Sequence, residues 1–157
     1  MNSVFPEFNQ SLSFQLHHLV KLMGYRANQI LEQELDITFS QFRVLMMVAD
    51  MSQPSQREVA DCLDVTAAAI SRHIDGMCDR GLILKQQKPD NRREHVLALT
   101  QVGVRKIDAA RQLLHNSFDA LVSEQLSERE VAQLQNSIQK IATAFEATTP
   151  QQKGGKS

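Results

Sequence analysis

One short segment of the chain, Thr66–His73, combines small side chains with hydrogen-bond donors. Its candidate contact residues are Thr66, Ala67, Ala68, Ser71, Arg72 and His73. Small residues let a helix backbone approach base edges, and alanine methyl groups can meet thymine methyl groups. Serine and arginine side chains can bond to bases or to phosphates. These residue types, at this spacing, favour recognition of duplex DNA.

A second cluster is basic and lies between Arg80 and Arg93. Its cationic residues are Arg80, Lys85, Lys88, Arg92 and Arg93, and Asp90 is its single acid. The net charge of the whole chain is −1, which alone argues against nucleic acid. Screening confines each charge to about a Debye length, so a local basic edge matters more for phosphate binding than the total. We expect Arg92 or Arg93 to reach a minor groove, whose negative potential suits arginine.

Two short helices and a tight turn are predicted to position the first cluster. Ser55-Gln56-Arg57-Glu58 has the spacing of a capping box and opens a helix that ends at Leu63. Asp64-Val65 forms the turn, and Thr66 caps a second helix that runs to about Asp79. In a helix-turn-helix the first helix supports the second, which enters the major groove. The apolar residues expected to hold the two helices together are Ala60, Leu63, Val65, Ile70 and Ile74.

The remaining elements surround this pair. Strands are predicted at 82–87 and 94–99, around a polar turn at 88–92. A long helix is predicted from about Asn9 to Gln33, and another, with Phe42, Leu45, Met46 and Ala49 on its inner face, from Thr38 to about Met51. Two more are predicted after Thr100 and after Ser127. The apolar residues of the last helix, Val131, Leu134, Ile138, Ile141 and Phe145, alternate three- and four-residue steps, as in helices that pack in pairs.

From the first helix to the last, the sequence resembles the MarR-type (multiple antibiotic resistance regulator) transcription factors. The resemblance is carried by residues 66–75, by Arg80-Gly81-Leu82-Ile83, by Asn91-Arg92-Arg93 and by Leu99-Thr100-Gln101-Val102-Gly103. The family's wing motif has an aspartate two residues before an arginine. In that motif a Leu-Thr pair begins eight residues after the aspartate. Leu99-Thr100 is that pair here, so Asn91 stands at the aspartate position. Either Asn91 replaces that aspartate beside Arg93, or the hairpin is one residue longer and Asp90 serves Arg92.

The resemblance implies a mostly helical α+β fold, a winged helix-turn-helix whose N- and C-terminal helices form a dimerisation domain. We assign residues 1–34 and 101–147 to dimerisation, 35–100 to DNA binding and 148–157 to a disordered tail. The resemblance also implies a homodimer that binds inverted-repeat operators in double-stranded DNA. Such a protein usually acts as a repressor that a small molecule or an oxidant releases from DNA. The apolar stripes near both ends of the chain support the dimer independently.

Other function classes have weaker support. No Gly-rich phosphate loop, HExxH or GxSxG motif occurs, so we expect no enzyme and no cofactor. His17 and His18 are adjacent and face different sides of a helix, which disfavours a metal site. Cys62 and Cys78 lack CxxC spacing and lie in apolar helical patterns, which predicts reduced thiols in the cytoplasm. A redox role for either thiol is the less favoured alternative. No apolar run approaches the roughly 18 residues of a membrane span.

Three alternatives stay open at this stage. The first is that Arg72 pairs with Asp75 instead of contacting DNA. Arg80, by contrast, is expected to hold down a helix end. Met46, Met47 and Met51 are expected to fill the core, although a ligand pocket near this helix is the other possibility. A winged-helix module that has lost DNA binding and contacts other proteins is the alternative function, favoured by the near-neutral net charge.

Overall fold

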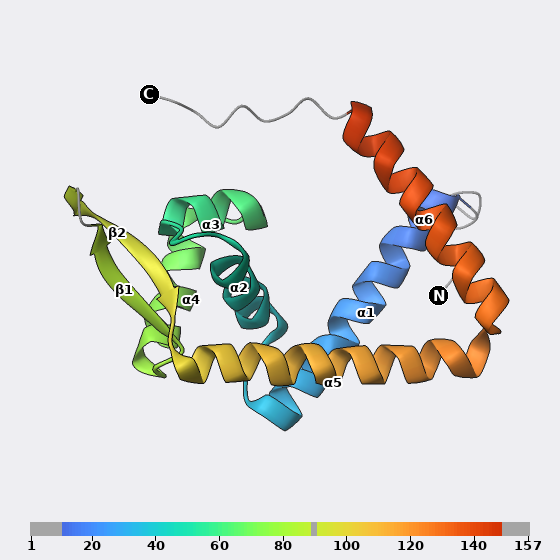
Figure 1. Ribbon diagram of the computed structural model, residues 1–157, viewed down its shortest axis with the longest axis horizontal. Coiled ribbons are helices and arrows are strands. Elements are labelled where there is room, and N and C mark those ends of the chain that lie inside the picture. Colours follow the sequence, from blue (N-terminus) through green and yellow to red (C-terminus); the bar gives the residue numbers. More distant parts are fainter. Residues whose placement is uncertain (1–10, 89–90, 149–157) are drawn as a thin grey trace, which may run out of the picture. The chain divides into compact units, whose positions relative to one another are not determined.

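The computed structural model describes residues 11–88 and 91–148, with the backbone alone for residues 88 and 91–94. Within these ranges the order of elements is α1 (Leu12–Leu35), α2 (Phe39–Asp50), α3 (Gln56–Leu63), α4 (Ala67–Asp79), β1 (Ile83–Lys88), β2 (Asn91–Leu99), α5 (Gln101–Gln125) and α6 (Glu128–Thr148) (Figure 1). The predicted mostly helical α+β fold is confirmed. The predicted start of the first helix at Asn9 and the tail beyond Thr148 lie outside the described residues, and Thr148 itself ends α6.

Side-chain caps set the helix ends. The Thr38 hydroxyl accepts a hydrogen bond from the Gln41 amide at 3.1 Å, while the Gln41 side chain accepts one from the Thr38 amide at 3.0 Å. Ser55 and Glu58 make the same reciprocal pair at the start of α3. These bonds satisfy amides that have no partner within the helix. Thr66 caps α4 through its hydroxyl in the same way. The predicted starts of α2, α3 and α4 are therefore each set by a side-chain hydrogen bond.

The chain divides into two compact units, Met1–Leu114 and His115–Ser157. The core of the first unit is apolar and takes residues from every element of α1 to α5. Its fully enclosed larger side chains include Leu31, Ile37, Leu45, Ile74, Met77, Ile83 and Leu97. Helices α2, α3 and α4 gather beside the β1–β2 hairpin (Figure 1).

Helix α2 departs from the predicted inner face. Phe42 and Leu45 are buried as expected, but Val44 and Val48 are buried too, whereas Ala49 is exposed and Met46 is only half-buried. The reason is that α2 contacts α1, α3, α4 and β2, so its apolar surface is wider than one stripe. Met47 and Met51 are also half-buried, at the margin of this core.

Strands β1 and β2 form an antiparallel hairpin in which Ile83 pairs with Leu99 and Gln87 with His95. The register shifts between Gln87 and Lys88, and Lys88 then pairs with Asn91. Strand β2 therefore begins at Asn91, inside the stretch predicted as a turn, because this bulge lets pairing continue toward the tip.

Large apolar side chains remain exposed in both units. In the N-terminal half of α1 these are Leu12, Phe14, Leu16, Leu19, Val20, Leu22 and Met23. In α6, all of whose residues are described, none is buried, and Leu134, Ile138, Ile141 and Phe145 are exposed. No helix among the described residues is long and apolar enough to cross a membrane.

Candidate nucleic-acid interface

Helices α3 and α4 are joined by a turn that a single left-handed residue creates. Asp64, at φ 53°, ends α3, and the Val65 amide then donates to the Ala60 carbonyl at 3.1 Å. Aspartate tolerates this conformation better than most residues. The Thr66 hydroxyl accepts from the Ala69 amide at 3.2 Å and starts α4 at once. Ala60 is 3% exposed, as expected for a small residue where two helices cross.

Helix α4 has a buried face and an exposed face. Ile70, Ile74 and Met77 are buried against the rest of the first unit. Thr66, Ala67, Ala68 and Arg72 are exposed, and Ser71 and His73 are half-buried. All the predicted contact residues of this segment are thus at least partly accessible. Val65 was expected to pack between the helices but is 40% exposed, because it belongs to the turn that joins them and its side chain is only partly covered.

A hydrogen-bonded group connects α4 to the hairpin. The Lys85 ammonium donates to one carboxylate oxygen of Asp75, and the Ser71 hydroxyl lies 3.4 Å from the other. The hydrogen bond and the charge of Lys85 lower the pKa of Asp75, and Ser71 adds to this effect. The sequence suggested Arg72 as a partner of Asp75; the structure pairs Asp75 with Lys85. Strand alternation could have indicated this pair. Lys85 is two residues from the buried Ile83, so its side chain lies on the same side of the strand.

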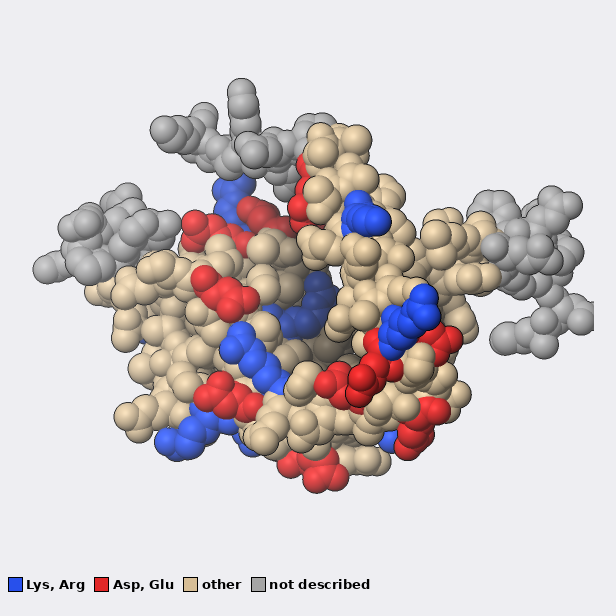
Figure 2. Space-filling model, turned by 45° about the vertical axis from the view of Figure 1, so that its right-hand side comes forward, with Lys and Arg blue, Asp and Glu red and all other residues tan. Residues whose placement is uncertain are grey.

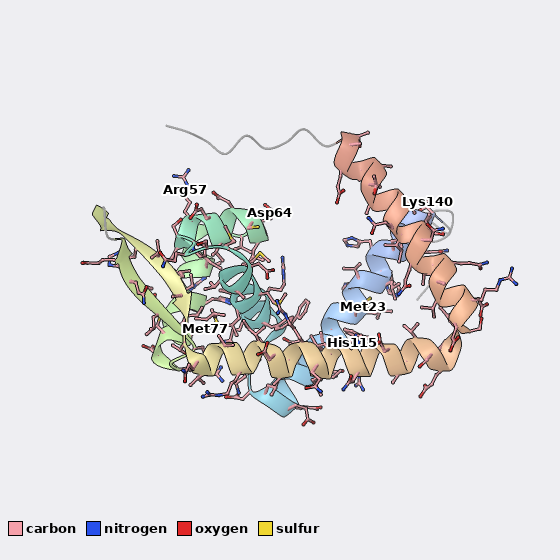
Figure 3. The ribbon with its side chains drawn as sticks, viewed as in Figure 1. Met23, Arg57, Asp64, Met77, His115 and Lys140 are labelled. Carbon is pink, nitrogen blue, oxygen red and sulfur yellow. The ribbon has the colours of Figure 1, made fainter. Side chains whose placement is uncertain are left out.

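Arg80, at the C-terminal end of α4, serves the fold. Its guanidinium donates to the Asp36 carboxylate at 2.8 Å, to the Asp36 carbonyl, and to Gln41 at 3.5 Å. The prediction that Arg80 holds down the helix end is confirmed. Arg57 on α3 has no comparable anchor and projects outward, 3.9 Å from Asp61 (Figure 3).

The hairpin is attached to the helix-turn-helix at its base. Ser55 and Val96 form an isolated antiparallel bridge, and the Leu97 amide donates to the Pro54 carbonyl at 2.8 Å. Arg92 and Arg93 lie in β2, but their side chains are outside the described residues, as is Asp90. Whether Asp90 or Asn91 accompanies the wing arginine therefore stays a prediction.

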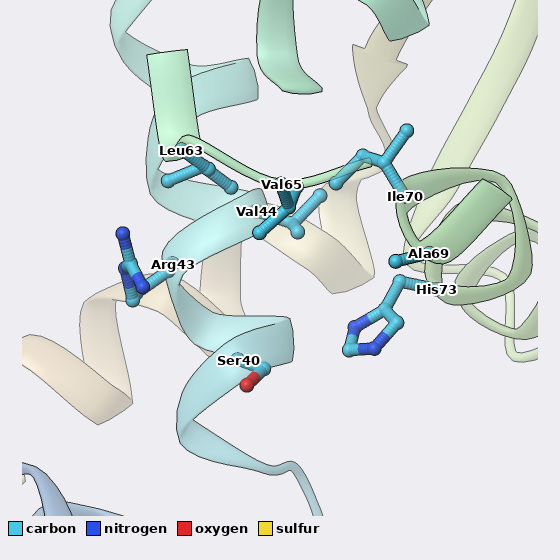
Figure 4. Close-up of a pocket in the computed structure, with 8 residues that line it drawn as sticks. All are labelled: Ser40, Arg43, Val44, Leu63, Val65, Ala69, Ile70 and His73. Carbon is cyan, nitrogen blue, oxygen red and sulfur yellow. The ribbon is translucent and has the colours of Figure 1, made fainter. Parts of the chain in front are cut away.

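A cavity of about 110 Å³ lies between α2, the turn after α3, and α4 (Figure 4). Its lining is Ser40, Arg43, Val44, Leu63, Val65, Ala69, Ile70 and His73. The lining is apolar inside, with two basic side chains, Arg43 and His73, among its polar groups. The sequence placed His73 among the candidate DNA contacts, but it gave no sign of Arg43, which belongs to no motif. Met46, Met47 and Met51 do not line this cavity.

The two cysteines of the described residues differ in exposure. Cys78 is partly buried, and burial raises the pKa of its thiol. Cys62 is exposed on α3, contrary to the apolar setting expected from its neighbours, because the buried face of this helix is formed by Val59, Ala60 and Leu63. Both cysteines are free, and residues 11–88 and 91–148 contain no group of three or more potential metal ligands.

Charge is locally mixed on the surface. On the face drawn in Figure 2, lysine and arginine side chains are interspersed with aspartate and glutamate. Any DNA contact made by this face would therefore depend on a few placed groups and not on a broad positive field.

Two short helices joined by a tight turn, with an attached two-stranded hairpin, define a winged helix-turn-helix protein. The model of the MarR family matches residues 35–94. The multiple antibiotic resistance protein MarR of Escherichia coli (strain K12) is 24% identical over 144 residues, which cover 90% of this chain and 99% of that protein. The chain is therefore similar to MarR-family proteins, both in the matched segment and over most of its length.

Solved structures agree with this fold. MepR, a transcription regulator of the Staphylococcus aureus multidrug efflux pump MepA, superposes with a TM-score of 0.73 at 25% identity, over 86% of this chain and 98% of MepR. A mutant E. coli MarR complexed with operator DNA gives a TM-score of 0.70 at 24% identity, over 89% of this chain and 99% of that one. The predicted winged-helix fold is confirmed by these matches.

Proposed function

We propose that the protein is a DNA-binding transcription regulator, a repressor that acts as a homodimer on inverted-repeat operators. The observation that carries the proposal is the division of α4. Ile70 and Ile74 fix the helix on the core, while Ala67, Ala68 and Arg72 are left on an accessible face. A helix with one face packed on the core and the opposite face accessible can enter the major groove of DNA. The MarR relative solved with operator DNA has the same fold and supports this function.

The contact residues of this proposal are Thr66, Ala67, Ala68, Ser71, Arg72 and His73 of α4, with Arg92 and Arg93 of the hairpin. The α4 residues would reach base edges and phosphates, and a hairpin arginine the adjacent minor groove. No chemical transformation is involved, and the proposal places the protein in the cytoplasm with its DNA target.

Dimerisation is supported by the apolar side chains that each unit leaves exposed. Monomeric proteins rarely expose contiguous apolar patches of more than a few hundred Å². Helix α6 presents Leu134, Ile138 and Ile141 at the spacing of a helix-packing seam, and the first half of α1 presents a second apolar set. A two-fold dimer would carry two α4 helices to half-sites about one helical turn apart.

Response to a small-molecule effector is the last part of the proposal. The cavity of about 110 Å³ beside α4 is larger than one water molecule requires. Ala69, Ile70 and His73 of α4 form one of its walls. A ligand that wedged between α2 and α4 would shift α4 relative to the hairpin. Such a ligand lowers DNA affinity only if it binds the DNA-free arrangement more tightly.

Fluorescence anisotropy with duplexes from the region around the protein's own gene tests the proposal. We expect tight binding to an inverted repeat and an affinity that falls steeply with salt. Arg72→Ala should weaken binding by about 1–3 kcal/mol, as should alanine at whichever of Arg92 or Arg93 makes a specific contact. Arg129→Ala, in α6, is the matched control and should change little. No binding to any inverted repeat would favour the protein-interaction module instead.

A further inference from the structure

The side chains of Ser71, Asp75 and Lys85 form a chain of contacts at the edge of the proposed DNA-reading face. Ser71 and Asp75 are one helical turn apart on α4, and Lys85 comes from β1. Ala68, one turn before Ser71, is exposed, and so is Asp75. The Ser71 hydroxyl therefore lies on the accessible side of the helix, between two exposed neighbours.

The hydrogen of the Ser71 hydroxyl has a defined direction in this arrangement. An ionised carboxylate only accepts hydrogen bonds. Lys85 donates to Asp75 and keeps it ionised, consistent with the lowered pKa of Asp75. Ser71 must then be the donor in its 3.4 Å contact with Asp75. A serine hydroxyl has one hydrogen and two lone pairs, so what Ser71 can still offer outward is its lone pairs.

We propose that Asp75 is a positioning residue that makes Ser71 a hydrogen-bond acceptor toward the major groove, and so selects a base with an exocyclic amino group. Only adenine N6 and cytosine N4 present such donors in that groove, whereas guanine and thymine present O6 and O4 as acceptors. Lys85 contributes by neutralising the acid, which would otherwise repel nearby phosphates. This inference rests on the proposed function.

The readout that separates this role from a structural one is base preference. Full-length protein selects from a pool of duplexes with a randomised central segment, and the experiment is repeated with Ser71→Ala, Asp75→Asn and the double variant. We expect the wild type to require adenine or cytosine at one position of each half-site. Ser71→Ala and Asp75→Asn should each lower that preference by about tenfold, which is typical of one hydrogen bond. The double variant should equal Ser71→Ala.

Two controls sharpen the test. Asp79→Asn removes the same charge from the same helix and should leave the base preference unchanged. On the selected duplex, an analogue that lacks the exocyclic amino group should weaken wild-type binding about tenfold and leave Ser71→Ala unaffected. Melting temperatures of all variants verify that each is folded.

Three outcomes overturn the inference. Asp75→Asn could keep the wild-type preference, the position that depends on Ser71 could be guanine or thymine, or Ser71→Ala could alter no position. In each case the wild type still selects a sequence, so the proposed function survives. If the wild type selects no sequence at all, the proposed function fails and this inference fails with it.

Discussion

Gly103, in the first turn of α5, lies directly against the backbone carbonyl of Leu82, at the start of the hairpin. A Cβ atom at position 103 would overlap the Leu82 carbonyl oxygen. That carbonyl also accepts a hydrogen bond from the Thr100 amide at 3.1 Å. The close approach therefore fixes α5 to the segment between α4 and the hairpin, and only glycine leaves room for it.

Gly103→Ala is accordingly expected to be strongly destabilising. The new methyl group would meet backbone, which cannot move aside without displacing α5 or the hairpin, so we expect a loss of about 3 kcal/mol or more. The matched control is Gly76→Ala in α4, where an added Cβ meets no atom within 4 Å. Helix propensity should make that variant about 0.5–1 kcal/mol more stable. Urea unfolding measures both, and equal stabilities would refute the close contact.

Removal of the Arg80 guanidinium should loosen the end of α4. Arg80→Ala loses the ion pair with Asp36 and the bond to the Asp36 carbonyl. Because Asp36 is 95% exposed, solvent screens the pair, and we expect a loss of only about 1 kcal/mol in the free energy of unfolding. Arg57→Ala, which breaks the 3.9 Å contact with Asp61 at an exposed site, should cost less than about 0.5 kcal/mol. A larger loss for Arg57→Ala would contradict this ranking.

The sequence predicted the elements of this fold well because their ends are set locally. Thr38, Ser55 and Thr66 each cap a helix through bonds within one turn. Long-range relationships were harder to predict. The need for glycine at 103 and the partner of Asp75 depend on segments brought together by folding, and the outward position of Cys62 depends on how α3 is rotated. The arginines of the hairpin were found from charge, but their contacts depend on a turn that local pattern did not define.

The capping box at the start of α6 predicts a measurable titration shift. The Ser127 hydroxyl and amide donate to the Glu130 carboxylate at 2.6 and 2.9 Å, and they hold the pKa of Glu130 below its usual value. Ser127→Ala should raise that pKa toward the usual value, as followed by NMR of the side-chain carboxyl. Ser137→Ala, whose hydroxyl donates to the Gln133 carbonyl within α6, should leave it unchanged.

The sign of the corresponding stability effect follows from linkage. A carboxyl whose pKa is lower in the folded state stabilises that state above its unfolded pKa and ceases to do so as pH falls through the folded pKa. The advantage of the wild type over Ser127→Ala should therefore be full at neutral pH and shrink in acid. An advantage that stays constant across that range would show that Glu130 does not contribute through its charge.

The exposed apolar face of α6 gives the most direct test of the dimer. Ile138 is 50% exposed, so in a monomer a lysine at this position would be tolerated and would change stability little. In a dimer that buries this face, Ile138→Lys places two charges in an apolar interface and should dissociate it. Sedimentation equilibrium should then show a monomer, and affinity for an inverted repeat should fall because two linked half-site contacts become independent.

Asn136→Lys is the control for this prediction, because it adds the same charge to another side of the helix, and this variant should remain a dimer. If Ile138→Lys and the wild type had the same mass in solution, α6 could not be the dimer seam, and the spacing of the two α4 helices would need another origin.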